Sequence, residues 1–244
     1  LILRRAVRRA ACVLTTSEYT KYDLQETLGV PEKNIIVTYQ APFLTHEAPE
    51  GEHRSLGERY GIHRPYVLYV GAAYPHKNVE RLLAAWQRVE EKYPGTYELI
   101  LVGKDDFFYT RLKGKLRGAV RYLGCVDDEL LSQLYEKARA FVYPSLSEGF
   151  GLPPLEAMLR GVPTIASNRT SLPEVLGEGV IYIDPENTEQ LADALARVLT
   201  DESLRTELKE KGRAETARYS WEKTARRTLK VYERCFGLNK KNVQ

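Results

Sequence analysis

Cysteine is scarce in this chain of 244 residues, and long apolar runs are absent from it. The three cysteines, Cys12, Cys125 and Cys235, are odd in number, far apart in the sequence and outside any Cys-x-x-Cys pattern. They support neither a disulfide framework nor a zinc site. No apolar stretch approaches the roughly 20 residues that span a bilayer, and the apolar start is too short for a signal peptide. We therefore expect a protein of the reducing cytoplasm.

The sequence also lacks a strong net charge, an internal repeat and a low-complexity tract. A net charge of +3 gives no indication of a nucleic acid partner, and none is expected. One local basic cluster could contact anionic lipid headgroups at the inner face of the plasma membrane, although a solvated helix face is the commoner explanation. This basic cluster comprises Arg111, Lys113, Lys115, Arg117 and Arg121.

What the sequence does contain is an alternation of apolar strands and helices. Apolar runs bounded by turn residues predict buried parallel strands at 66–71, 98–102, 120–123, 140–143, 163–167 and 180–183. Helices are expected after Asn78 and Asp127, which suit the cap position, and from Thr188 onward. Six strand–helix units predict an α/β fold with a doubly wound parallel sheet, in which ligands bind beyond the carboxyl ends of the strands.

The two ends of the chain have a different organisation. Residues 1–40 contain a predicted strand, a helix capped by Ser17 and ended by Gly29, and a second strand. We interpret them as part of another structural unit, of which too little is present here to form a core of its own. Four segments follow from this interpretation: that unit at 1–40, an inter-domain linker at 41–65, the sheet domain at 66–219, and at 220–244 a helix capped by Ser220 with a disordered tail.

The most informative segment is 147–158, Ser-Glu-Gly-Phe-Gly-Leu-Pro-Pro-Leu-Glu-Ala-Met. Its glycines leave backbone N–H groups accessible, and the prolines suit the first turn of a helix, whose amino end favours negative charge. Glu148 and Glu156 would be about 12 Å apart along a helix, too far for one acid–base dyad. The segment suits a nucleotide-sugar with its diphosphate at the glycines, although an ordinary strand-to-helix connection would use similar residues.

Four segments resemble motifs of one family and occur in the family's order. Residues 70–78 resemble a phosphate loop, 122–127 a base-binding loop, 144–158 a Glu-seven-residues-Glu motif, and 171–175 the segment downstream of it. The chain thus resembles the donor-binding, carboxy-terminal half of retaining glycosyltransferases of the GT-B fold, the family 4-like enzymes called glycosyl transferases group 1. The resemblance implies the Rossmann-like half of a GT-B fold, preceded at 1–40 by a small remnant, the last strand and helix, of a mostly absent amino-terminal acceptor domain.

The resemblance also implies roles for individual residues. Lys77 and Glu148 would be catalytic: Lys77 would contact the distal phosphate and stabilise the leaving group, and Glu148 would lie near hydroxyls of the transferred sugar. Glu156 would bind the ribose. The other implied donor-binding positions are Gly71, Ala72, Gly103, Cys125, Val126, Gly149, Phe150, Gly151 and Leu152.

The implied reaction transfers a hexosyl unit from a nucleotide-sugar to an acceptor hydroxyl with retention of configuration. No cofactor or metal is expected, because Lys77 and the helix amino end would replace a divalent cation; the acidic pairs 105–106 and 127–128 suit a turn and a helix cap. A saccharide or lipid-linked acceptor would bind to the missing domain, so the isolated chain is expected to bind donor but transfer poorly. The sugar and the base stay open.

One position departs from the family, and other functions deserve comparison. Many members carry arginine where this chain has Ala72, which removes a multi-donor phosphate contact that His76 could replace in part. A nicotinamide-dependent oxidoreductase is disfavoured, because no Gly-x-Gly-x-x-Gly follows the first strand of the sheet. A nucleotide-sugar epimerase of the same fold, or a non-catalytic nucleotide-sugar-binding module, stays open.

Overall fold

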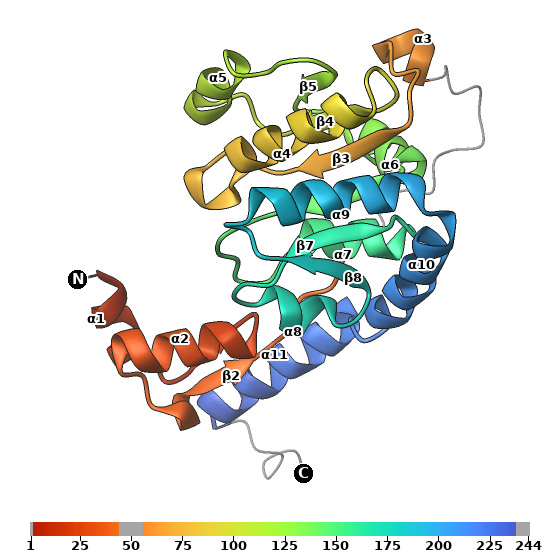
Figure 1. Cartoon of the computed structure of the whole chain (residues 1–244). Helices are drawn as coiled ribbons and strands as arrows, with labels where there is room; N and C mark the ends of the chain where they lie inside the picture. Colours follow the sequence, from red (N-terminus) through yellow and green to blue (C-terminus); the bar gives the residue numbers. More distant parts are fainter. Residues whose placement is uncertain (1, 44–55, 238–244) are drawn as a thin grey trace.

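A parallel sheet of six strands forms the centre of the computed structural model, which describes residues 2–43 and 56–237 (Figure 1). Its strands lie in the order β5-β4-β3-β6-β7-β8. They are β3 (Tyr66–Val70), β4 (Glu98–Val102), β5 (Val120–Gly124), β6 (Ala140–Tyr143), β7 (Thr164–Ser167) and β8 (Val180–Ile183). Three match the predicted bounds and three differ by one residue at one end. The predicted doubly wound α/β fold is confirmed.

The strand order creates a switch point between β3 and β6. From β3 the chain proceeds outward to β4 and β5, and it then returns to pair with β3 on its other side as β6. At such a point the two following loops diverge toward opposite faces of the sheet, and doubly wound proteins bind ligands there. The loops after β3 and β6 are therefore the first place to look for a site.

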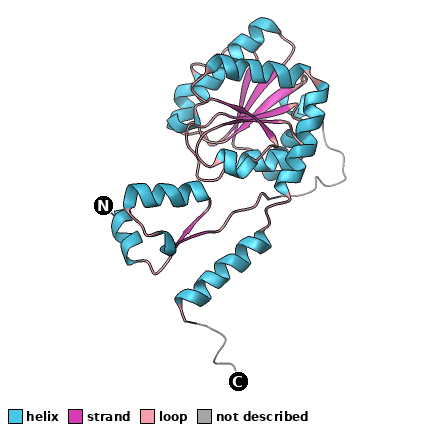
Figure 2. Cartoon of the chain, turned by 60° about the horizontal axis from the view of Figure 1, so that its bottom comes forward, coloured by secondary structure: helices cyan, strands magenta, loops and turns pink. Residues whose placement is uncertain are grey.

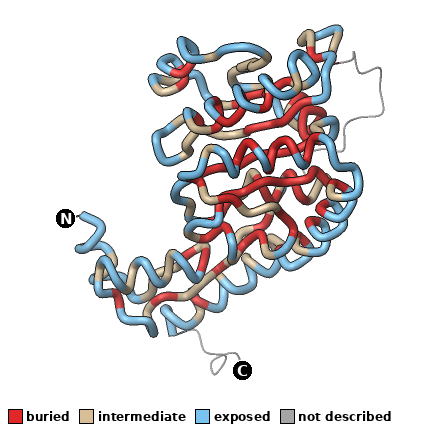
Figure 3. The backbone as a smooth tube through the Cα atoms, viewed as in Figure 1, coloured by how far each residue is buried: buried red, intermediate tan, exposed pale blue. Residues whose placement is uncertain are grey.

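Helices cover both faces of the sheet. On one face α4 packs against α9, and on the other α7 packs against α10. The inner strands β3, β4, β6 and β7 are buried along nearly their whole length, as a sheet covered on both faces requires, whereas the edge strands β5 and β8 are partly exposed (Figure 3). The helices of this domain are α3 (Leu56–Tyr60), α4 (Val79–Lys92), α5 (Phe107–Lys113), α6 (Asp128–Lys137), α7 (Leu152–Leu159), α8 (Leu172–Leu176), α9 (Thr188–Thr200) and α10 (Glu202–Thr216).

A smaller unit lies beside the sheet domain, next to the last helix (Figure 2). Its two strands pair in parallel. The aromatic ring of Tyr39, just after them, packs edge-on against Tyr219, and the Thr224 hydroxyl donates to the Tyr39 carbonyl. The elements of this region are α1 (Ile2–Arg9), β1 (Val13–Thr15), α2 (Glu18–Leu28), β2 (Ile35–Val37) and α11 (Trp221–Cys235).

Most of the predicted helix ends are confirmed. The side chains of Ser17, Asp127 and Ser220 each accept a hydrogen bond from a backbone N–H in the first turn, and Gly29 ends α2 in the left-handed conformation. Asn78 is different, because its backbone is left-handed and its side chain makes no cap bond. The prediction that it caps α4 is wrong, and its amide instead joins distant loops.

Some segments differ from the prediction or lie outside the described residues. Residues 41–65 were predicted to be a linker, yet α3 forms there and Leu56 and Ile62 are buried in the core of the sheet domain. Residues 44–55 of that segment and the predicted disordered tail at 240–244 lie outside the described residues. The helix α1 has no counterpart in the prediction.

The cysteines are free thiols, but two of them are neighbours in space. Cys12 precedes β1 and Cys235 ends α11. Burial, with a smaller contribution from Cys235, raises the pKa of the Cys12 thiol. Sequence separation alone did not indicate this proximity.

Candidate functional site

A lysine and a glutamate meet across the switch point. Lys77 ends a short turn after β3, and its Nζ lies 2.6 Å from Oε1 of Glu148, which follows β6. The same Nζ donates to the hydroxyl of Tyr143 over 3.1 Å. Only 16% and 11% of the two charged side chains is exposed. Charges so far withdrawn from water require partners, so this contact fixes a positive and a negative group at the carboxyl edge of the sheet.

The loop after β3 is held by several hydrogen bonds. The hydroxyl of Tyr69 donates to the Ala72 carbonyl over 2.7 Å, and that of Tyr109 donates to the Gly71 carbonyl over 2.8 Å. Farther along, the carbonyl of His76 accepts the N–H of Leu146 over 2.7 Å. The His76 ring itself is exposed. These contacts fix the backbone of the loop that carries Lys77.

Asn78 completes the connection between the loops. Its side-chain amide donates to the carbonyl of Pro144 over 3.1 Å and to that of Pro185 over 2.7 Å. The loops after β3, β6 and β8 thus share one amide group. The Asn78 amide therefore helps to hold the loop that carries Lys77 beside the loop that carries Glu148.

The glycine segment after Glu148 presents free amides. None of the hydrogen bonds among the described residues uses the N–H of Gly149, Phe150, Gly151 or Leu152. Gly151 has a φ of 103°, and a Cβ there would lie 2.6 Å from a Leu172 methyl, so the turn requires glycine. Free consecutive amides beside a lysine form a concentration of positive potential suited to a phosphate.

The amino end of α7 contributes less than the sequence suggested. The second and third residues of α7 are Pro153 and Pro154, which carry no backbone N–H. A helix start leaves the N–H groups of its cap residue and first three residues without an intrahelical partner, and of these α7 keeps those of Gly151 and Leu152. The predicted anion site therefore consists mainly of loop amides.

Glu156 lies on α7 beside a tyrosine. Its Oε2 accepts the hydroxyl of Tyr135 over 3.2 Å. Burial raises the pKa of the Glu156 carboxyl, while the hydrogen bond and the charge of Arg160 oppose that rise. A half-buried carboxylate with unfilled acceptor capacity is suited to hydroxyl donors.

Tyr143 interacts with both carboxylates, and sequence reasoning did not identify it. Burial first, and then the charges of Glu148 and Glu156, raise the pKa of its phenol. Its ring also lies under the Lys77 ammonium, 5.4 Å from the ring centroid. The available signal was its position as the last residue of a buried strand, directly before the motif.

The predicted base-binding positions follow β4 and β5 along the same edge. The N–H of Gly103 donates to the Gly124 carbonyl over 3.0 Å, and a Cβ at Gly103 would lie 2.1 Å from the Gly71 carbonyl oxygen. That position is therefore restricted to glycine. Cys125 is exposed and Val126 half-buried just beyond β5.

Three side chains of the acidic pairs have structural partners, and of these only the helix cap at Asp127 matches the prediction. Asp106 accepts the N–H groups of Phe108 and Tyr109 at the start of α5, and Asp105 pairs with Lys113 over 2.7 Å. Asp127 caps α6. Within the described ranges, no three His, Cys, Asp or Glu side chains are grouped as a metal site requires.

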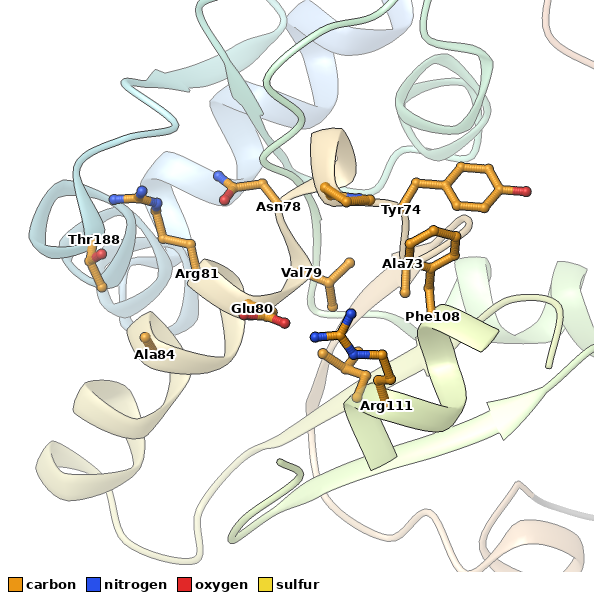
Figure 4. Close-up of a pocket in the computed structure, with 12 residues that line it drawn as sticks. Ala73, Tyr74, Asn78, Val79, Glu80, Arg81, Ala84, Phe108, Arg111 and Thr188 are labelled. Carbon is orange, nitrogen blue, oxygen red and sulfur yellow. The ribbon is translucent and has the colours of Figure 1, made fainter. Parts of the chain in front are cut away.

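A cavity of about 520 Å³ lies next to the site, between α4 and α5 (Figure 4). Tyr74, Val79, Arg81, Phe108 and Arg111 are among the side chains that line it. None of the predicted donor-binding residues does so. Those residues lie along the edge of the sheet, and Lys77 and Glu148 mark its centre.

The basic cluster is largely engaged in local contacts. Lys115 pairs with Glu80 over 2.8 Å and Arg121 with Glu98 over 3.6 Å. Arg117 donates to two neighbouring carbonyls. Of the cluster, only Arg111 and Lys113 lie on a helix, while Arg121 lies in β5, so the prediction of a single helix face is wrong. No helix within residues 2–43 and 56–237 is both long and apolar enough to cross a membrane.

The comparison with protein families decides the classification. Residues 59–215 match the model described as glycosyl transferases group 1. The chain belongs to this family. The match covers the switch point, the Lys77–Glu148 pair and the glycine segment, so these lie within the part that defines glycosyl transferases group 1.

Curated members of glycosyl transferases group 1 are similar to this chain over most of its length. O-antigen chain mannosyltransferase B of Escherichia coli is 35% identical over 238 residues, which cover 95% of this chain and 62% of that protein. O-antigen chain mannosyltransferase RfbU of Salmonella typhimurium is 32% identical over 211 residues, covering 80% of this chain and 56% of that protein. The chain thus spans about three fifths of the length of these relatives.

Solved structures confirm the fold. Sucrose-phosphate synthase from Thermosynechococcus elongatus has a TM-score of 0.77 at 24% identity, covering 98% of this chain and 61% of that one. Anabaena Alr3699/HepE, solved in complex with UDP-glucose, also has a TM-score of 0.77, at 18% identity, covering 93% of this chain and 65% of that one. The fold is the Rossmann-like half of a GT-B glycosyltransferase.

Proposed function

We propose that this chain is the donor-binding half of a glycosyltransferase that transfers a mannosyl unit from a nucleotide-sugar to a saccharide hydroxyl. One observation carries the proposal: the Lys77–Glu148 pair bridges the switch point directly beside the free amides of residues 149–152. The relatives named O-antigen mannosyltransferases support mannose as the sugar. The comparisons favour neither an epimerase nor a non-catalytic module.

The leaving group explains the positive charge. As the anomeric carbon–oxygen bond breaks, negative charge grows on the departing nucleoside diphosphate. The Lys77 ammonium, held by Tyr143 and Glu148, and the amides of the glycine segment would stabilise that charge without reorganising. One such preorganised donor typically lowers a barrier by about 3 kcal/mol. The proposed mechanism requires no metal, because the protein supplies the cation.

The carboxylates would bind the neutral parts of the donor. Glu148, with a second oxygen beyond its contact with Lys77, would accept sugar hydroxyls, and Glu156 would accept the ribose hydroxyls. Gly103, Cys125 and Val126 would lie along the base. The acceptor would approach from the side from which the diphosphate leaves, which gives retention of configuration.

The acceptor side of the reaction belongs to a further domain in this proposal. We accordingly propose weak or no transfer by the chain alone, cytoplasmic access to the nucleotide-sugar, and a saccharide or lipid-linked acceptor at the inner membrane face. The support is the length of the relatives, of which this chain spans about three fifths.

The test is a thermal-unfolding panel of nucleoside diphosphates and nucleotide-sugars. A ligand that binds the folded state raises the unfolding temperature in proportion to the logarithm of its concentration. We expect one nucleoside diphosphate, and the mannose nucleotide built on the same base, to stabilise the chain more than the others. Absence of stabilisation by any nucleoside diphosphate at millimolar concentration would contradict donor binding.

A further inference from the structure

Three hydroxyl groups from the smaller unit converge on one carbonyl of the glycine segment. The Ser17 hydroxyl lies 2.8 Å from the carbonyl oxygen of Gly149, and those of Thr16 and Thr20 lie 3.0 and 3.4 Å from it. Ser17 is fully buried, and its oxygen also accepts the N–H of Thr20 as the cap of α2. These partners are more than 120 residues away from Gly149 in the sequence.

A planar peptide makes this carbonyl important for the proposed donor site. The Gly149 carbonyl and the Phe150 N–H belong to the same trans peptide unit, so they point in opposite directions. When the carbonyl is directed toward Ser17, the Phe150 N–H is directed away from it. A glycine peptide can otherwise rotate easily, because no Cβ restricts its dihedral angles.

The preceding peptide is held in the same manner. The Ser171 hydroxyl donates to the Glu148 carbonyl over 2.9 Å. Because the Glu148 carbonyl and the Gly149 N–H belong to one trans peptide, this contact directs the Gly149 N–H away from Ser171. The Glu148 N–H is itself taken by the Thr170 hydroxyl over 2.9 Å. Two successive peptides therefore have their carbonyls occupied by protein and their N–H groups free.

A second contact keeps the start of α2 in place. The carboxylate of Glu174, in α8, accepts the backbone N–H of Glu18 over 2.8 Å and that of Tyr19 over 3.0 Å. It also accepts the Tyr39 hydroxyl over 2.8 Å. A carboxylate at a helix amino end is stabilised by the free N–H groups there, so α2 is anchored at the two residues that directly follow Ser17.

We infer that Ser17, assisted by Thr16, is a positioning residue for the donor diphosphate. Its hydroxyl holds the Gly149–Phe150 peptide in the orientation that presents the Phe150 N–H to phosphate oxygen. The inference rests on the proposed donor function, and it assigns part of the donor site to a segment outside residues 59–215, which match the family model. Loss of the tether lets the peptide rotate and place its carbonyl where the phosphate binds.

Two variants separate positioning from stability. Thr16→Val removes one hydroxyl without changing the shape of the side chain or the helix cap. Ser17→Ala removes the stronger tether and also the cap, which costs about 1 kcal/mol of stability. The matched control is Thr27→Ala, because Thr27 lies on the same helix and its hydroxyl donates to the Asp23 carbonyl at the surface.

The readout is the ratio of two affinities for the same chain. Affinities for the nucleoside diphosphate found in the unfolding panel and for its phosphate-free nucleoside are measured by calorimetry and ligand-observed NMR. We expect Ser17→Ala to lower diphosphate affinity about 5- to 10-fold and Thr16→Val about 2- to 3-fold, with nucleoside affinity unchanged. Thr27→Ala should leave both affinities unchanged.

The outcomes distinguish the inference from the proposed function. In one outcome, the unsubstituted chain binds the diphosphate while both variants show the same ratio of diphosphate affinity to nucleoside affinity as that chain. In that case the tether is only structural and the inference is wrong. If the unsubstituted chain binds no nucleoside diphosphate, the proposed function fails and the inference fails with it. Should Ser17→Ala not fold, Thr16→Val alone decides the question through the same ratio.

Discussion

At the scale of single residues, Lys77 and Glu148 define the chemistry of the site by neutralising each other. Their side chains are mostly buried and touch at 2.6 Å, so each depends on the other for a partner. An incoming diphosphate would share the Lys77 ammonium with Glu148, and the sugar hydroxyls would share the carboxylate. In the proposed mechanism, the pair would therefore contact the groups on both sides of the bond that breaks.

A Tyr143→Phe variant tests how strongly phosphate binding by Lys77 depends on the hydrogen bond between its ammonium and the Tyr143 hydroxyl. Tyr143→Phe keeps the ring beneath the ammonium but removes the hydroxyl that lies 3.1 Å from Nζ. We expect nucleoside diphosphate affinity to fall about 3- to 5-fold, because Lys77 loses one of its orienting contacts, while stability changes by less than about 1 kcal/mol. Calorimetry and urea unfolding measure the two effects. Unchanged affinity would show that Glu148 alone positions Lys77.

Glu156 gives a prediction with a defined pH dependence. Burial raises the pKa of its carboxyl in the folded chain, so the folded state holds this proton to higher pH than the unfolded state does. Stability therefore falls as pH rises from the ordinary glutamate pKa through the raised one. The Glu156→Gln variant has no carboxyl to ionise at this position, so its stability does not fall in this way as pH rises.

We expect Glu156→Gln to unfold at higher urea concentration than the unsubstituted chain at pH 7.5, with the difference shrinking toward pH 4. Its nucleotide affinity should fall, because an amide oxygen is a weaker acceptor for ribose hydroxyls than a carboxylate. A surface substitution, Glu207→Gln on α10, is the control. A stability difference that is equal at both pH values would contradict the role of burial.

At the scale of elements, the loops after β3, β6 and β8 act together because one side chain joins them. The Asn78 amide donates to the carbonyls of both Pro144 and Pro185. Sequence reasoning expected this residue to cap α4, because asparagine before a helix usually does so. Its partners are 66 and 107 residues away, and no local pattern could indicate them.

Asn78 offers a test that separates backbone conformation from hydrogen bonding. Its φ is 61°, which glycine adopts freely and alanine does not. Asn78→Gly should cost about 1–2 kcal/mol for the two lost hydrogen bonds, and Asn78→Ala about 1 kcal/mol more for the left-handed backbone. Urea unfolding measures both. Equal stability of the two variants would show that the backbone conformation relaxes.

The elements themselves were predictable for a physical reason. Strands buried on both faces are mostly apolar, so the inner strands could be identified from short apolar runs bounded by turn residues, and the partly exposed edge strands β5 and β8 show a weaker form of the same pattern. The helix caps at Ser17, Asp127 and Ser220 depend on residues within one turn, and the sequence indicated them as well. Helix α3 was missed because it has five residues, too few to show a period.

At the scale of the whole molecule, the sequence predicted the fold class and the family, and both are confirmed. The assignments of site residues came from motif resemblance and stay predictions. Motifs named Lys77 and Glu148 but could not show their contact across 71 positions, nor the interaction of Tyr143 with both carboxylates. The contact between Ser17 and the Gly149 carbonyl could not be predicted either. A local sequence pattern indicates that Ser17 caps a helix, but it does not indicate a second hydrogen-bond partner that is distant in the sequence.

The smaller unit contacts the segment to which the proposal assigns the donor diphosphate. Its contacts reach the glycine segment through Ser17 and reach α8 through Glu174. Phe150, in that segment, packs against Tyr219 at 5.7 Å between ring centroids, beside the start of α11. A change in the position of this unit would therefore alter the backbone of the glycine segment, which in the proposal binds the diphosphate.

The central claim is that Lys77 holds the diphosphate of a nucleotide-sugar, and the most direct measurement is nucleoside diphosphate affinity of Lys77→Ala by calorimetry. The control is Lys209→Ala on α10, and urea unfolding verifies that both variants are folded. Because one charge-assisted contact to phosphate is lost, we predict at least a tenfold loss of affinity for Lys77→Ala and none for Lys209→Ala. Equal affinities of Lys77→Ala and the unsubstituted chain would contradict the account.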